Sequence, residues 1–163
     1  MRKGQAAMEF LMTYGWAILV VIAAIAALAY FGVLDPARLL PERCQSSAGM
    51  DCVDKASITT TQIDFALQNN VAFDILVQNA TITGITCTGS SASAGTSGAY
   101  TALDGSNNVT VSNNEVVRVR YSGCSGVNSG SKFEGTATVR YVNTNTGLPH
   151  PVTVDIRGSV AQP

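Results

Sequence analysis

Charged side chains are scarce in this chain of 163 residues, of which only 13% are Asp, Glu, Lys or Arg. The ten basic and eleven acidic side chains leave a formal net charge of −1. The excess of basic charge that neutralises nucleic-acid phosphates is therefore absent. A folded domain of this composition must build its surface mostly from Ser, Thr, Asn and Gln, which is ordinary for a protein exposed at the cell surface.

Residue types that support catalysis or metal binding are also few. The one histidine, His150, lies between Pro149 and Pro151, a setting that predicts a turn residue rather than a general base. The sequence contains no G-x-S-x-G, no phosphate loop and no H-E-x-x-H. It also lacks a C-x-x-C pair of the kind that binds zinc. We therefore expect no enzyme activity, no catalytic residues, no metal site and no cofactor.

What the sequence does have is a long apolar segment near its start. The 25 residues from Phe10 to Leu34 carry no charge, and Glu9 is the only charge between Gln5 and Leu34. A helix needs about 20 such residues to span a bilayer. The run is too long for the core of a secretory signal peptide, and no A-x-A cleavage pattern follows it. These features predict a hydrophobic helix over residues 5–34.

Small residues recur along this segment and include Gly15. Ala23 and Ala27 form a small-xxx-small step, which lets helix backbones approach closely in apolar surroundings. The composition therefore favours packing between the helices of several copies.

The residues around the start of the segment resemble a type III, prepilin-type signal sequence. Arg2-Lys3-Gly4 is followed by Gln-Ala-Ala-Met-Glu-Phe and an apolar helix, and residues 2–34 most resemble archaeal type IV pilins. The resemblance implies cleavage between Gly4 and Gln5 by a prepilin peptidase. It also implies that Glu9, at the fifth mature position, pairs with a subunit N-terminus during assembly. The alternative from composition alone is that Glu9 lies at the level of the lipid headgroups and has no such role. The mature chain would begin with Gln rather than the Phe usual in bacterial pilins, and it lacks the Gly-Ile-rich start of archaellins.

The next residues predict a joint between the helix and a second domain. Asp35 before Pro36 is typical of an N-cap followed by a first-turn proline. We expect a kink there, one or two helical turns ending near Pro41, and a neck over residues 42–57. The domain organisation predicted is a leader (1–4), an assembly helix (5–34), a kink and neck (35–57) and a head (58–163).

The head alternates apolar and polar residues with a period of two, which is typical of strands with one buried face. Two sheets packed face to face would bury these faces, so we expect six to eight strands in an immunoglobulin-like sandwich and an α+β chain overall. Gly84 predicts a bend. Residues 88–114 predict an exposed loop or an irregular hairpin, with one short strand at 109–111. The apolar positions of the expected strands are 63, 65 and 67; 71, 73, 75 and 77; 117, 119 and 121; 137, 139 and 141; and 152, 154 and 156.

Four cysteines in a domain outside the membrane indicate disulfides, and they allow three pairings. We favour Cys44–Cys52, which would close the neck, and Cys87–Cys124, which would join two strand ends. Zinc is the rival interpretation.

Two N-x-T sequons, at Asn79 and Asn108, are candidate glycosylation sites on an exterior surface. Arginines on the expected strands would form a basic stripe if those strands were neighbours. The favoured alternative is a solvated face on which Asp155 or Glu134 opposes them. The arginines concerned are Arg118, Arg120, Arg140 and Arg157.

Together these features predict a structural subunit of an archaeal type IV, adhesion-type pilus. The precursor would lie in the cytoplasmic membrane with Arg2 and Lys3 inside and the head outside. After cleavage it would polymerise with copies of itself at the cell surface. Its other partners would be the prepilin peptidase, the pilus assembly machinery and cell or surface receptors, but not nucleic acid. A pseudopilin-like subunit, an archaellin and a permanently anchored surface protein stay open as alternatives.

Overall fold

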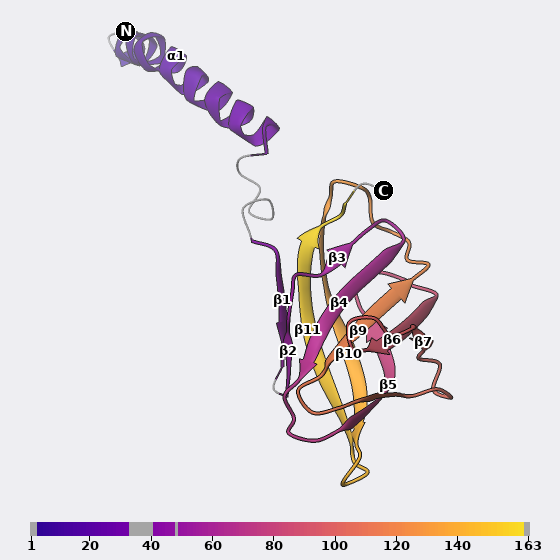
Figure 1. The fold of residues 1–163 in the computed structure, drawn as a ribbon. Coiled ribbons are helices and arrows are strands. Elements are labelled where there is room, and N and C mark those ends of the chain that lie inside the picture. Colours follow the sequence, from indigo (N-terminus) through magenta and orange to yellow (C-terminus); the bar gives the residue numbers. More distant parts are fainter. Residues whose placement is uncertain (1–2, 33–40, 48, 162–163) are drawn as a thin grey trace. The chain divides into compact units, whose positions relative to one another are not determined.

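The structure is a computed structural model that describes residues 3–32, 41–47 and 49–161. The chain divides into two compact units, Met1–Leu40 and Pro41–Pro163. Among the described residues, the helix belongs to the first unit and the strands belong to the second (Figure 1). We refer to the second unit as the β domain.

The apolar segment forms one helix, α1 (Lys3–Tyr30). The helix begins inside the expected leader and ends four residues before Leu34, where we had expected its end. Gly32 adopts a φ of +68°, in the left-handed region that glycine favours, and its N–H donates to the carbonyl of Ala29 over 3.1 Å. This turn ends the helix although the apolar composition continues. The predicted kink at Asp35 and the helical turns up to Leu40 lie outside the described residues.

The β domain consists of two antiparallel sheets. One sheet has the strand order β1-β11-β10-β5-β8. The other has the order β2-β4-β9-β6-β7, with β3 also paired to β4. The strands are β1 (Arg43–Ser46), β2 (Met50–Cys52), β3 (Ser57–Ile58), β4 (Gln62–Asn69), β5 (Ile75–Ile82), β6 (Gly89–Ala94), β7 (Thr101–Ala102), β8 (Val109–Val111), β9 (Val116–Ser122), β10 (Lys132–Asn143) and β11 (Pro149–Ser159).

Both sheets contribute to one core. The predicted alternation is confirmed in β4, β9, β10 and β11, where every second side chain is buried over most of each strand. Ile63, Leu67 and Val119 from one sheet and Val139 and Val154 from the other are all fully buried in one cluster. The α+β class, with an apolar N-terminal helix before antiparallel sheets, is therefore confirmed.

The expected neck is wrong, because residues 43–58 form strands of both sheets. β1 pairs with β11, whereas β2 and β3 pair with β4. These strands have two to four residues, and together they bury only two large apolar side chains, Met50 and Ile58. An alternating pattern cannot be recognised in segments this short, so the sequence did not predict these strands. Because they belong to the two sheets, the β domain begins at residue 41 instead of 58.

The expected strand from Val71 to Val77 is also wrong in its first half. Val71 and Phe73 lie in a turn before β5, where Ala72 has a φ of +68° and Phe73 is 44% exposed. The side chain of Asn69, buried at the end of β4, donates to the carbonyls of Phe73 and Ser112 over 2.8 and 3.0 Å and fixes this turn. A buried amide therefore overrides the apolar alternation.

Residues 88–114 contain more strand than the exposed loop or irregular hairpin that the sequence predicts. They include β6, β7 and the predicted short strand β8. β6 pairs with both β9 and β7, and the strand consists only of Gly, Ser and Ala. Gly84 has a φ of +87° in the predicted bend. His150 lies within β11 and is exposed, so the turn expected there is wrong.

Candidate functional site

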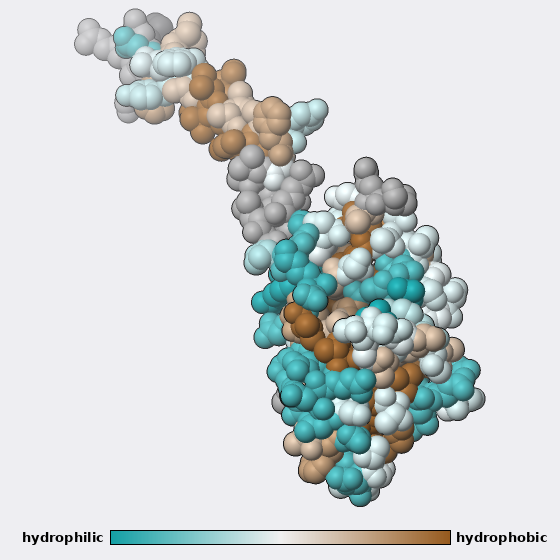
Figure 2. Space-filling view, viewed as in Figure 1, coloured by the Kyte–Doolittle hydropathy of each residue, from teal (hydrophilic) through white to brown (hydrophobic). Residues whose placement is uncertain are grey.

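The surface of α1 is the first candidate site, because its large apolar side chains are exposed on every side. Figure 2 shows hydrophobic residues gathered on the visible face of the helix. The stretch Met8–Tyr30 is long and apolar enough to cross a membrane, by length and composition. The exposed fractions of its large side chains lie between 46% and 87% for Met8, Phe10, Met12, Tyr14, Trp16, Ile18, Leu19, Val20, Val21, Ile22, Ile25, Leu28 and Tyr30.

The small residues singled out from the sequence lie on this exposed surface. Ala23 and Ala27 are both exposed and stand four residues apart, so they share one face of the helix. A Cβ added at Gly15 would meet no atom within 4 Å. The surface therefore has shallow positions at which another helix can approach closely.

Glu9 lies within α1 and its side chain is exposed. One turn further on, the Thr13 hydroxyl donates to the Glu9 carbonyl over 2.7 Å. Gly4 and Gln5 are both part of the helix as well. Cleavage between them and pairing of Glu9 with a subunit N-terminus stay predictions.

The four cysteines form two disulfides, Cys44–Cys52 and Cys87–Cys124, the pairing favoured from the sequence. Cys87 precedes β6 and Cys124 follows β9, and these two strands are neighbours. The other bridge does not close a neck. It joins β1 of the five-stranded sheet to β2 of the six-stranded sheet.

The two sequons lie on neighbouring parts of one sheet. Asn79 is exposed and lies within β5, opposite Arg140, instead of at the strand end that we had expected. Asn108 is exposed and immediately precedes β8, which pairs with β5 through Val77 and Val109. Glycosylation of either asparagine stays a prediction.

The arginines do not form one stripe, because their strands belong to different sheets. Arg118 and Arg120 lie on β9. Arg120 Nε donates to Asp64 Oδ1 over 2.8 Å, and its guanidinium carbon lies 4.0 Å from the centre of the Tyr100 ring. The hydrogen bond to Asp64 raises the pKa of Arg120 above its ordinary value.

On the other sheet Arg157 of β11 pairs with Glu134 of β10. This pair, like that of Arg120 with Asp64, fits the solvated face that we favoured over a basic stripe. The sequence did not point to Tyr100 or Asp64, because both lie far along the chain from the arginine that they contact.

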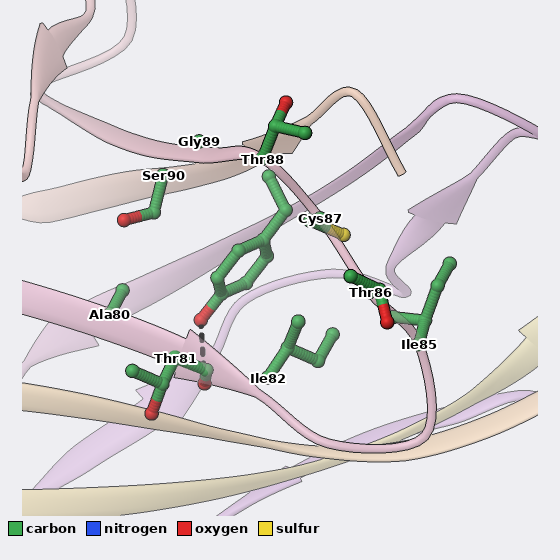
Figure 3. A pocket seen from close by; sticks show the side chains of 10 residues that line it. Ala80, Thr81, Ile82, Ile85, Thr86, Cys87, Thr88, Gly89 and Ser90 are labelled. Atoms are coloured by element: carbon green, nitrogen blue, oxygen red, sulfur yellow. Dashed lines mark hydrogen bonds between the residues drawn. The ribbon is translucent and has the colours of Figure 1, made fainter. Parts of the chain in front are cut away.

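A hollow of about 330 Å³ lies between the end of β5 and the start of β6. Figure 3 shows Thr81, Ile82, Ile85 and Thr88 around it. The hydroxyl of Tyr121 donates to the Thr81 carbonyl over 3.0 Å and so links the two sheets. Burial raises the pKa of Tyr121 above its ordinary value. The lining combines hydroxyl and aliphatic groups, with no carboxylate, imidazole or amine to serve as an acid or base.

The described residues contain no group of three or more His, Cys, Asp or Glu placed to hold a metal ion. In comparisons with known proteins, no family model and no curated protein matches the chain. The exposed helix and the disulfide-linked β domain are therefore the features from which a function can be inferred.

Proposed function

We propose that this chain is a structural, non-enzymatic subunit of a type IV, adhesion-type pilus, assembled through α1 and displayed outside the cell. The exposed apolar surface of α1 supports this function most strongly. Leaving a large apolar side chain in water costs about 1.5–3 kcal/mol relative to burying it. Summed over the more than ten such side chains on this helix, the cost exceeds the 5–15 kcal/mol that is the usual free energy of unfolding of a protein. The helix therefore requires lipid or other helices around it.

Two different surroundings meet this requirement one after the other, first the lipid bilayer and then the filament. The stretch Met8–Tyr30 has 23 residues, which corresponds to about 34 Å of helix and matches the hydrocarbon core of a bilayer. The precursor is held there first. After cleavage between Gly4 and Gln5, helices of many copies replace the lipid and pack through small residues such as Ala23 and Ala27.

The properties of the β domain support an extracellular location. Both disulfides require an oxidising compartment to persist. In this proposal the β domain is an immunoglobulin-like sandwich whose two sheets share one core, and its polar outer faces coat the filament. Exposed Asn79 and Asn108 are available there for glycans.

The second candidate is a permanently anchored surface protein, because one helix that is long enough to cross a membrane is all that an anchor needs. Sequencing the N-terminus of the protein isolated from the cell surface separates the two. The pilus proposal predicts a chain that begins at Gln5, and replacement of Gly4 by a bulky residue leaves the leader uncleaved. A surface form that begins with Met1 supports the anchor and contradicts the pilus.

A further inference from the structure

The two strands at which the chain enters the β domain are edge strands of different sheets. β1 is the last strand of the five-stranded sheet and pairs with β11, whereas β2 is the last strand of the six-stranded sheet and pairs with β4 (Figure 1). They follow each other directly in the chain. Because the chain passes from α1 into β1, any pull on the helix reaches the β domain at β1 first.

The pairing of β1 is vulnerable to such a pull. β1 and β11 are antiparallel, with Arg43 opposite Arg157 and Ser46 opposite Val154. The start of β1 therefore lies beside the end of β11. A force that separates these two ends breaks the hydrogen bonds one after another, starting at Arg43, instead of loading them all together.

Without a further restraint the opening would continue along the chain. β2 has three residues and β3 has two, and both are held mainly by β4. Their release would expose the buried side chains of Met50 and Ile58 and open one edge of the core.

The Cys44–Cys52 bridge changes the path of the force. Cys44 is the second residue of β1, and its sulfur is bonded to Cys52 at the end of β2. A force that reaches Cys44 passes directly to Cys52 and so to the other sheet, and residues 45–51 carry none of it. The pair of Cys44 with Ile156 in one sheet and the pair of Cys52 with Leu67 in the other must then yield together.

Glu42 makes a second link between the sheets, two residues before Cys44. Its Oε1 accepts from the Ser159 N–H over 3.1 Å and lies 3.9 Å from Lys132 Nζ of β10, while its Oε2 lies 3.5 Å from Lys55 Nζ. Lys55 lies between β2 and β3, on the side of the six-stranded sheet. The hydrogen bonds from Ser159, and then the charges of the two lysines, hold the pKa of Glu42 below its ordinary value. The carboxylate is therefore charged at neutral pH.

We infer that the Cys44–Cys52 bridge and Glu42 form a mechanical clasp, which divides a pull arriving through α1 between both sheets and prevents the edge of the β domain from peeling. This role rests on the proposed function, because a subunit held by its helix in a filament is pulled in this way.

Single-molecule pulling with optical tweezers tests the clasp on the full chain in detergent. One handle is attached at Ala37 through an azide-bearing residue and the other at the C-terminus, so that the force bypasses α1. The wild-type chain is expected to open in one cooperative event. The C44S/C52S variant is expected to show an earlier event at lower force that releases residues 43–58, or about 55 Å of chain at about 3.3–3.6 Å per residue.

The matched control is C87S/C124S, which lacks the other disulfide and should show no early event. In the C44S/C52S background, Glu42→Gln should lower the force of the early event. If C44S/C52S fails to fold, reduction of the wild-type chain by a phosphine during the pull should produce the same early event. An early event of this size in the unreduced wild type, or its absence after removal of the bridge, contradicts the clasp. Because single chains are measured, a failure to find filaments leaves this result unchanged.

Discussion

At the scale of single residues, Asn69 holds the turn between β4 and β5 in place, a role that its position in the sequence does not reveal. Its buried amide donates to Phe73 and Ser112 and accepts from the Val71 N–H over 3.1 Å, so it joins the β4–β5 turn to the end of β8. Each buried polar group left without a partner costs about 1–3 kcal/mol. Asn69→Ala should therefore lower the free energy of unfolding by about 2–4 kcal/mol in denaturant titrations of the full chain.

The neighbouring Asn70 provides the control. Its side chain is exposed and donates to Asp51 over 2.7 Å at the surface. Asn70→Ala should change the free energy of unfolding by less than about 0.5 kcal/mol. Equal losses in the two variants would contradict the role given to Asn69.

Tyr121 makes the stability of the β domain depend on pH in alkaline solution. Burial raises its pKa in the folded chain, whereas in the unfolded chain its pKa is near 10. The unfolded state therefore loses this proton first as the pH rises, and stability should fall above about pH 10. In Tyr121→Phe the fall should be smaller, and the lost hydrogen bond to Thr81 should cost about 0.5–1.5 kcal/mol at neutral pH. An unchanged pH profile would argue against this role of Tyr121.

At the scale of elements, the two disulfides should differ in their equilibrium contributions. Cys44 and Cys52 are 8 residues apart, and Cys87 and Cys124 are 37 apart. The loop-closure model gives about 2–3 kcal/mol for the shorter loop and about 4 kcal/mol for the longer one. In denaturant titrations C87S/C124S should be less stable than C44S/C52S, although only C44S/C52S is expected to open early under force. The reverse order of stability would mean that the entropy of the unfolded chain is not the main source of the stabilisation by these disulfides.

The strands also show how far the sequence specifies this fold. β4, β9, β10 and β11 were predicted because each has seven or more residues and buries one face in the core, so a period of two is visible. β1, β2 and β3 are too short to show a period. β6 has no apolar residue larger than Ala and is held by its hydrogen-bonded neighbours. The arginine contacts depend on pairings between distant strands, such as that of β9 with β4, which no local pattern encodes.

The small residues of α1 should affect assembly of the filament without affecting insertion into the membrane. Replacing both Ala23 and Ala27 by Leu keeps the helix apolar and able to enter a bilayer, but it fills the shallow face. We expect the precursor to accumulate in membranes at the wild-type level while the yield of sheared filaments falls at least about tenfold, equivalent to a loss of about 1.4 kcal/mol per subunit contact. Leu19→Ile, which preserves side-chain volume, should assemble normally. Wild-type filament yield in the double Leu variant would contradict close packing at this face.

At the scale of the whole molecule, the two units are suited to different surroundings. α1 exposes apolar side chains that require lipid or other helices, whereas the β domain buries its apolar side chains in a core and carries two disulfides. A chain of this kind is expected to leave the membrane only when other copies replace the lipid around α1.

Cryo-electron microscopy of material sheared from the cell surface tests this claim most directly. We expect filaments in which the α1 helices of many copies, each beginning at Gln5, form the axis and the β domains form the outer layer. Sheared material without such filaments, together with a chain recovered from membranes only as a monomer, would contradict it.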